Sequence, residues 1–164
     1  MSEGADEPQR FCLRCGFVHY PVSYPTASAL IVENGRLLLT QRRRDPFAGD
    51  WELPGGFLNA GEHPEQGVVR EIAEELDVTV AVEALVGIFT DLYADAYADA
   101  FGLGKETLNL FYRCRIVNGR PVAQSEIAQF RWFAPDELPS NIAFRCNQQA
   151  VSCWVRSSLS KVQA

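Results

Sequence analysis

The stretch GGFLNAGEHPEQGVVREIAEELDV, residues 55–78, decides how this chain folds. In its second half, apolar residues recur at the spacing i, i+3, i+4 and i+7, which defines one face of an α-helix. These residues are Val69, Ile72, Ala73 and Leu76. Pro64 suits the first helical turn, where its missing N–H costs nothing, and the residues before it have the composition of a loop. We therefore predict a helix over residues 64–76.

This helix carries three glutamates where helix physics disfavours them. Glu71, Glu74 and Glu75 are predicted to share the face opposite the apolar one. Like charges four residues apart repel by roughly 0.2–0.5 kcal/mol, and acids near the negative C-terminus cost roughly 0.3–1 kcal/mol each. A bound divalent cation would reverse this balance, so the cluster predicts a metal site. A plain solvated acidic face is the alternative.

The wider spacing of residues around the helix resembles the Nudix box, the signature of the Nudix hydrolase family. The positions that match in register are Gly56, Glu62, Arg70, Glu71, Ile72, Glu74, Glu75 and Val78. Asp77 departs from the pattern, because the family usually has glycine there to end the helix in the left-handed conformation. The segments 49–56 and 131–139 also resemble the family's flanking sequences. The resemblance thus covers about residues 25–140.

Length and composition favour one compact domain, because 164 residues of which 47% are hydrophobic can bury a sizeable core. Asn34-Gly35 is a strong hairpin signal, and strands and helices interleave along the chain without repeats. The predicted strands are residues 27–32, 36–41, 78–90, 108–116 and 128–133, with a short helix at 135–138 and an amphipathic helix at 147–161. This order predicts an α/β/α sandwich. The resemblance implies the same α/β Nudix fold with a mixed β-sheet, in a Nudix hydrolase domain over residues 25–164.

The resemblance also implies a metal-dependent hydrolase. Glu71, Glu74 and Glu75 would bind Mg²⁺, with Mn²⁺ as a substitute, and the carbonyl of Gly56 or of the glycine before it would add an oxygen ligand. Arg70 would orient the glutamates. The reaction would be attack of an activated water on the P–O–P bridge of a nucleoside diphosphate derivative.

The general base is left open between two catalytic candidates. Glu71 matches the box position that activates water in some family members. Glu126 lies in a loop six residues before Trp132 and resembles a distal glutamate that binds metal or acts as base in others. An ordinary surface acid is the alternative interpretation of Glu126.

Residues outside the box are predicted to select the substrate. Arg42 and Arg44 are candidates for contacts with substrate phosphates, and Tyr93 and Tyr97 for stacking on a base, with ordinary surface positions as the alternative. ADP-ribose or a dinucleotide is favoured slightly over nucleoside triphosphates. A non-catalytic regulatory domain that binds a nucleotide or ADP-ribose is the other functional hypothesis. Such domains commonly lose box carboxylates, and this chain keeps them. An isopentenyl diphosphate isomerase and an RNA decapping enzyme have less support.

The N-terminal segment, residues 1–24, contains half a zinc knuckle. Cys12 and Cys15 have the C-x₂-C spacing of zinc ligands, and His19 is a candidate third ligand, but no second cysteine pair follows. The family's NADH pyrophosphatases carry a zinc ribbon ahead of the box, which this segment resembles. Bound Zn²⁺ is one interpretation, and a vestigial or simply packed knuckle is favoured over it.

Charge and cysteine content restrict the partners and the compartment. The net charge of −6 and the scattered basic residues argue against a nucleic-acid partner. The N-terminus lacks an apolar signal segment, and no run approaches the roughly 18 apolar residues of a membrane helix. The odd number of cysteines, five, disfavours a disulfide framework and predicts the cytoplasm. The predicted partner is a small nucleotide-type substrate, without nucleic acid or membrane, and a homodimer is left open.

Overall fold

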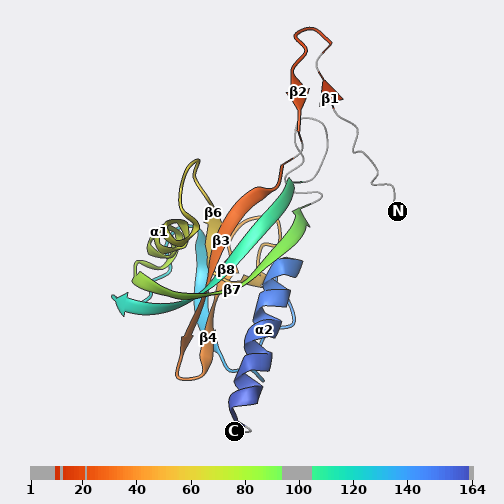
Figure 1. Cartoon of the computed structure of the whole chain (residues 1–164). Coiled ribbons are helices and arrows are strands. Elements are labelled where there is room, and N and C mark those ends of the chain that lie inside the picture. Colours follow the sequence, from red (N-terminus) through yellow and green to blue (C-terminus); the bar gives the residue numbers. More distant parts are fainter. Residues whose placement is uncertain (1–9, 12, 21, 94–104, 163–164) are drawn as a thin grey trace, which may run out of the picture.

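The computed structural model describes residues 10–11, 13–20, 22–93 and 105–162. Its main sheet has seven strands in the order β5-β4-β3-β8-β7, with β6 paired to β3 and β9 paired to β4. These strands are β3 (Tyr24–Glu33), β4 (Arg36–Arg42), β5 (Trp51–Glu52), β6 (Gly55–Phe57), β7 (Thr79–Tyr93), β8 (Lys105–Asn118) and β9 (Ile127–Phe133). A separate two-stranded sheet, β1 (Arg10–Phe11) with β2 (Val18–His19), stands away from the main body in Figure 1.

The main sheet is mixed because β3 runs parallel to β8 and antiparallel to β4 and β6. The turn between β3 and β4 holds Asn34 at φ 49° and Gly35 at φ 74°, which are the left-handed conformations that a tight hairpin turn requires. The parallel pair needs a crossover, and the helix at the box together with β7 supplies it. The five predicted strands are confirmed. Strand β7 continues past its predicted end at residue 90, and β8 begins before its predicted start at residue 108.

Helix α1 (Pro64–Leu76) has the predicted bounds. Pro64 occupies the first turn, and the His63 side chain accepts a hydrogen bond from the Glu65 N–H, which caps the helix. The helix ends at Asp77, which takes the left-handed conformation at φ 55° and donates its N–H to the Ala73 carbonyl at 3.0 Å. Aspartate therefore fills the position where glycine was expected without changing the helix exit.

The buried face of α1 is rotated relative to the prediction. Its buried residues are Gly67, Val68, Ile72, Glu75 and Leu76. Ala73 is exposed, so the predicted apolar face was wrong at this position, whereas the half-buried Val69 packs against the core on this side of the sheet. Glu75 enters the interface between helix and sheet instead of sharing an outer face with Glu71 and Glu74, and this part of the prediction was also wrong.

Replacing Asp77 with glycine should stabilise the fold. Glycine adopts φ 55° without the steric cost that a side chain carries there, and the change removes a negative charge from the C-terminal end of α1. Glycine's larger loss of chain entropy offsets part of this gain. We expect Asp77→Gly to add about 1 kcal/mol, or about 2–4 °C in melting temperature, measured by thermal denaturation. A lower melting temperature would contradict this account of the helix exit.

The two helices cover opposite faces of the sheet, with α2 (Arg145–Val162) on the face away from α1 (Figure 1). The core on the α1 side includes Ala27, Ala29, Ile31, Leu38, Val68, Ile72, Leu76, Tyr112 and Cys114. The core on the α2 side includes Leu30, Leu37, Leu39, Phe111, Phe133, Val151 and Trp154. Neighbouring residues of β3 and β4 thus enter different cores, as the alternation of side chains along a strand requires. The predicted α/β/α sandwich is confirmed.

Two differences concern the C-terminal part. Residues 135–138 form a turn and not the predicted short helix. The Glu137 N–H donates to the Ala134 carbonyl, which closes a single turn, and Pro139 follows at once, so a helix has no room to continue. Helix α2 begins two residues before its predicted start. Among the described residues, no helix has the length and apolar character needed to cross a membrane.

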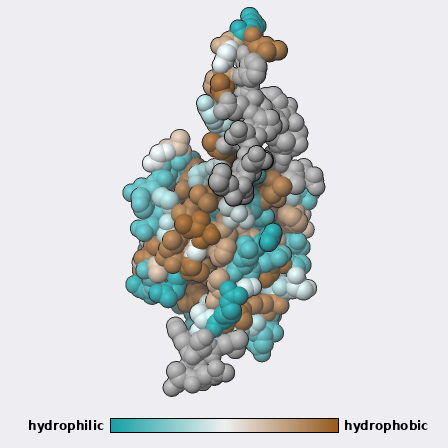
Figure 2. Space-filling model, turned by 45° about the vertical axis from the view of Figure 1, so that its right-hand side comes forward, coloured by the Kyte–Doolittle hydropathy of each residue, from teal (hydrophilic) through white to brown (hydrophobic). Residues whose placement is uncertain are grey.

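Apolar side chains reach the surface of the molecule at several places (Figure 2). Strands β7 and β8 contribute Leu85, Ile88, Leu92 and Leu108 to the exposed large apolar residues, and the β1–β2 region contributes Leu13 and Phe17. Exposed apolar side chains of this kind are a common feature of protein contact surfaces. The homodimer stays open.

Candidate active site

Glu75 is a carboxylate buried beside glycine backbone. Its residue is only 6% exposed, and its Oε2 accepts a hydrogen bond from the Gly55 N–H at 3.1 Å. Burial raises the pKa of Glu75 well above its usual value of 4.5, and the charges of Glu52, Glu71 and Glu126 raise it further. Among the described residues, no arginine or lysine pairs with it. A buried acid in these surroundings is expensive to ionise unless a cation accompanies it.

Glu71 lies one helical turn before Glu75 and faces β6. Its side chain is 13% exposed, and burial raises its pKa although Arg70 pairs with it. A Cβ atom added at Gly56 would lie 2.6 Å from the Glu71 carboxyl carbon. Only glycine therefore allows the backbone of β6 to come this close to the carboxylate.

Arg70 forms hydrogen bonds with several residues of the box. Its Nε and Nη2 donate to the two carboxylate oxygens of Glu62 at 2.8 and 2.9 Å, and its Nη1 donates to Glu71 Oε1 at 2.8 Å. Further bonds reach Glu74 and the Phe57 carbonyl. The hydrogen bonds from Arg70 hold the pKa of Glu62 at about 2. Glu62 therefore stays ionised and keeps its two hydrogen bonds with the Arg70 guanidinium. These contacts fix one oxygen of Glu71, and the other has no hydrogen bond to the residues that the structure describes.

Glu74 lies outside the group that Glu71 and Glu75 form. Its side chain is 59% exposed, and its one hydrogen bond within the described residues is to Arg70 at 3.2 Å. The reason is geometric, because Glu74 is one residue from Glu75 and so points about 100° around the helix axis from the face that Glu75 buries against the sheet. The structure brings together two of the three predicted box ligands.

A cleft of about 370 Å³ opens above Glu71 and Glu75. Its walls come from the loop after β4, from β5 and β6, from α1 and from the loop before β9. The lining residues are Arg42, Arg43, Arg44, Asp45, Glu52, Gly55, Gly56, Phe57, Glu71, Glu75 and Glu126. The predicted residues Arg42, Arg44, Gly56 and Glu126 thus meet at the same opening as the buried carboxylates. The volume is that of a small-molecule site.

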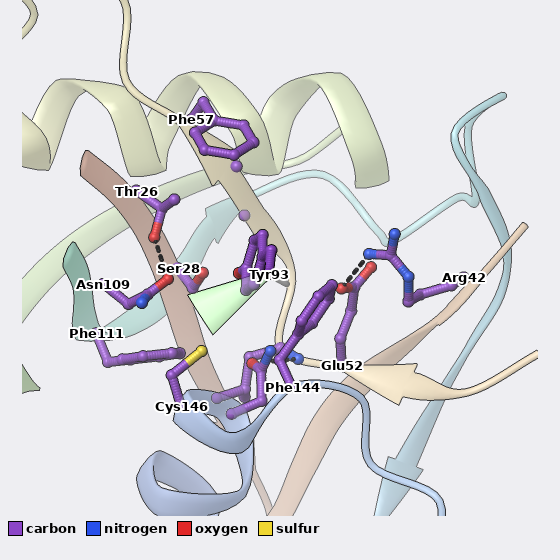
Figure 3. A pocket seen from close by; sticks show the side chains of 14 residues that line it. Thr26, Ser28, Arg42, Glu52, Phe57, Tyr93, Asn109, Phe111, Phe144 and Cys146 are labelled. Atoms are coloured by element: carbon purple, nitrogen blue, oxygen red, sulfur yellow. Dashed lines mark hydrogen bonds and ion pairs between the residues drawn. The ribbon is translucent and has the colours of Figure 1, made fainter. Parts of the chain in front are cut away.

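A second, smaller cavity of about 80 Å³ adjoins the cleft (Figure 3). The two share five lining residues, which are Arg42, Glu52, Gly55, Gly56 and Phe57. Tyr93, at the end of β7, lines the second cavity together with Phe144, and their ring centroids are 4.4 Å apart. Tyr97 lies outside the described residues. An aromatic wall therefore stands directly beside the carboxylate cleft.

Sequence reasoning missed Glu52, Phe57 and Phe144. Glu52 carried a signal, since an acid within the apolar segment Trp51–Pro54 is unusual for a buried strand. It is largely buried, and desolvation raises its pKa although Arg42 pairs with it. Phe144 carried no local signal, because its place depends on how the chain returns to the sheet before α2.

The residues of the cleft fit a hard divalent cation. Glu71 and Glu75 supply carboxylate oxygens with raised pKa values, and the backbone of Gly56 approaches to within contact of Glu71. Within the described ranges, no three acidic, histidine or cysteine side chains are close enough to form a metal cage by themselves. Mg²⁺ usually retains several waters and takes only one or two protein carboxylates. The two carboxylates of this cleft therefore suit its usual coordination.

The raised pKa values predict how pH and metal affect stability. Glu71 and Glu75 hold protons more tightly in the fold than when unfolded, so the metal-free protein loses stability as pH rises above 4.5 and through their folded pKa values. Mg²⁺ should reverse this loss, because it binds the ionised form. We expect Mg²⁺ to raise the melting temperature more at about pH 8 than at about pH 5, measured by differential scanning fluorimetry. Equal shifts at the two pH values would contradict it.

The N-terminal cysteines do not form a described site. Cys15 is exposed in the turn between β1 and β2, and Cys12 lies outside the described residues. The zinc knuckle and the division at residue 24 stay predictions, and elemental analysis of the purified protein would test the former.

Comparisons with known proteins agree with this geometry. A family model described as "NUDIX domain" matches residues 23–154. A MutT-like protein of Streptomyces ambofaciens is 34% identical over 121 residues, which are 74% of this chain and 70% of that protein. An ADP-ribose pyrophosphatase of Methanocaldococcus jannaschii is 41% identical over 61 residues, so the match spans only 37% of this chain and 36% of that enzyme.

Among solved structures, a NUDIX hydrolase from Nitrosomonas europaea superposes with a TM-score of 0.75 at 23% sequence identity. The superposition covers 96% of this chain and 84% of that one, so it compares nearly the whole fold. With a family model spanning most of its length and the box residues of α1 beside the glycines of β6, the chain belongs to the Nudix hydrolase family.

Proposed function

We propose that this protein is a Mg²⁺-dependent hydrolase that cleaves the P–O–P bridge of a nucleoside diphosphate derivative. The observation that carries the proposal is the pair Glu71 and Glu75, two carboxylates with raised pKa values set against the backbone of Gly55 and Gly56 at the floor of a cleft. A strongly perturbed, buried acid at the floor of a cleft is typical of a functional site.

The chain's own residues divide the work of this reaction. Glu71 and Glu75, with the Gly56 carbonyl, would hold the metal, which when bound supplies charge neutralisation at the diphosphate. Arg70 keeps one oxygen of Glu71 fixed through the bond at 2.8 Å. Arg43 and Arg44 line the cleft and make no hydrogen bond or ion pair within the described residues, so their guanidinium groups are available to substrate phosphates.

The hydrolytic step adds one water across the bridge. The water oxygen forms a bond to one phosphorus, the bond between that phosphorus and the bridging oxygen breaks, and the water proton passes to a general base. The bridging oxygen leaves on the second phosphate. Glu71 and Glu126 both line the cleft and remain the two candidates for the base. Glu71 is largely buried and its pKa is raised by burial, while Glu126 is exposed and makes no hydrogen bond within the described chain.

We infer ADP-ribose or a dinucleotide as the preferred substrate, ahead of nucleoside triphosphates. The relative from Methanocaldococcus jannaschii is an ADP-ribose pyrophosphatase, and the cavity lined by Tyr93 and Phe144 offers aromatic surface beside the cleft. A linked nucleoside and a second group need room on both sides of the diphosphate. The smaller cavity adds aromatic surface beside the cleft, on one side of the diphosphate position.

A substrate panel tests this proposal. Purified protein with Mg²⁺ is given ADP-ribose, NADH, diadenosine compounds and nucleoside triphosphates, and products are separated by chromatography. We expect ADP-ribose or a dinucleotide to show the highest kcat/KM and to yield a nucleoside monophosphate. Fastest turnover of a nucleoside triphosphate would overturn the substrate assignment, and no turnover with either Mg²⁺ or Mn²⁺ would overturn the enzymatic one.

A further inference from the structure

Arg42 is engaged by the protein itself. Its Nη1 donates to Glu52 Oε2 at 2.6 Å, and its Nε donates to the Pro46 carbonyl at 2.7 Å. Its guanidinium carbon lies 4.8 Å from the centre of the Phe144 ring. Only 15% of the Arg42 side chain is exposed. The Nε–H, one Nη1–H and the face of the guanidinium therefore each have a partner within the fold.

The groups that Arg42 contacts belong to both cavities. Glu52 lines the cleft and the smaller cavity, whereas Phe144 lines only the smaller one (Figure 3). Pro46 precedes Phe47, whose ring packs edge-on against Phe144 with centroids 5.0 Å apart. Arg42 thus joins the loop after β4, strand β5 and the start of α2 at the boundary between the cavities.

Two of the residues around Arg42 have strained backbones. Phe47 has φ 65° and Phe144 has φ 60°, a left-handed conformation that bulky side chains rarely adopt. Such conformations persist only where the surrounding contacts determine them, and they gather at functional sites. The contact with the Phe144 ring and the hydrogen bond to the carbonyl just before Phe47 are contacts of this kind.

We propose that Arg42 is a positioning residue that shapes the smaller cavity for the nucleoside end of the substrate, while Arg43 and Arg44 contact the phosphates. This inference rests on the proposed function and assigns a different task to each arginine of the run. Arg42 holds Phe144 against Tyr93 and keeps Glu52 at the junction of the cavities. Its guanidinium is largely buried and already bound on the protein side, whereas Arg43 and Arg44 are exposed and make no hydrogen bond or ion pair within the described residues.

The test separates recognition of the nucleoside from recognition of phosphate. The holoenzyme with Mg²⁺ and its Arg42→Ala variant are compared in steady-state kinetics with the best substrate of the panel. Their binding of AMP and of methylenediphosphonate, a phosphate-only probe, is measured by calorimetry. We expect Arg42→Ala to raise KM and the Kd for AMP by about tenfold or more, with kcat changed by less than about threefold. Binding of methylenediphosphonate should stay within about twofold of the wild type.

Three further variants serve as controls. Phe144→Leu, which keeps Arg42 and removes the aromatic wall, should reproduce the loss of AMP binding. Arg42→Lys keeps a cation for Glu52 and should recover part of it. Arg43→Ala combined with Arg44→Ala should show the opposite pattern, with weaker binding of methylenediphosphonate by about fivefold. Melting temperatures of all variants identify any that fail to fold. If Arg42→Ala fails to fold, Phe144→Leu is used in its place.

Two outcomes would overturn the inference. If Arg42→Ala weakened the binding of methylenediphosphonate as much as the binding of AMP, Arg42 would be a phosphate ligand. If neither changed, it would have no positioning role. Because binding of AMP is measured apart from turnover, absence of hydrolysis by the wild type would remove the proposed function and leave this test intact.

Discussion

Replacing Glu75 with glutamine should lower kcat by about 10²- to 10³-fold, the usual effect of removing one group that stabilises charge in a transition state. The same change should raise the melting temperature of the metal-free protein. Glu75 is only 6% exposed and its pKa is raised by burial, so a neutral amide of the same shape removes the cost of a buried charge. Its carbonyl oxygen can still accept the Gly55 N–H. Lower activity with higher stability is the signature of a metal ligand.

Glu74→Gln is the matched control, because it makes the same chemical change one residue earlier on α1. Its side chain is 59% exposed and lies outside the cleft, where it pairs only with Arg70 among the described residues. We expect kcat to fall by less than about tenfold and the free energy of unfolding to change by less than about 1 kcal/mol. Steady-state kinetics and thermal denaturation with and without Mg²⁺ measure both variants. Equal losses of activity in the two variants, or wild-type turnover by Glu75→Gln, would contradict the assignment.

Replacing Gly55 with alanine should destabilise the fold by about 3 kcal/mol or more. Gly55 has φ 149°, a conformation that residues with side chains rarely adopt. A Cβ atom there would also lie 2.3 Å from the Ala27 carbonyl oxygen and 2.5 Å from the Ser28 Cα, both of which are backbone atoms of β3 that cannot turn aside. Strand β6 would have to leave β3, and Glu75 would lose the N–H that it accepts. We expect a melting temperature lower by about 6–12 °C.

Gly56→Ala tests the neighbouring glycine, which has no strained backbone. Its Cβ would meet the carboxyl end of Glu71 at 2.6 Å, and this flexible side chain can move away. Stability should therefore change by less than about 1–2 kcal/mol, while kcat falls by about 10²-fold because Glu71 is displaced from its place in the cleft. Thermal denaturation and kinetics separate the two effects. A Gly56→Ala variant that is destabilised, together with a Gly55→Ala variant that is as stable as the wild type, would contradict this account.

Local patterns in the sequence were enough for most of the fold. The bounds of α1 followed from Pro64 and the helical spacing of apolar residues, and the β3–β4 hairpin followed from Asn34-Gly35, since both signals depend on neighbours in the chain. The face of α1 was harder to predict. Counting apolar residues could not reveal that Glu75 is buried and Ala73 exposed, because that depends on where β6 lies.

In the candidate site, too, local spacing predicted some residues, whereas tertiary contacts decided the others. Spacing along one helix predicted the box glutamates and Arg70, because their separation is set by the helix itself. The environment of Arg42 could not be predicted, since its partners are Pro46, Glu52 and the distant Phe144. The sequence therefore suggested a phosphate contact for Arg42, and only the tertiary structure shows that its Nε and Nη1 donate within the protein.

The central claim is that water cleaves the P–O–P bridge in a metal-dependent reaction at this cleft. Phosphorus NMR of ADP-ribose with the purified protein and Mg²⁺, in water enriched with ¹⁸O, tests it most directly. The account predicts that the diphosphate resonances give way to two phosphomonoester resonances, one shifted by a single ¹⁸O, and that EDTA stops the change. ADP-ribose that binds tightly while its diphosphate resonances persist with Mg²⁺ and Mn²⁺ would contradict the account and favour a regulatory binding domain.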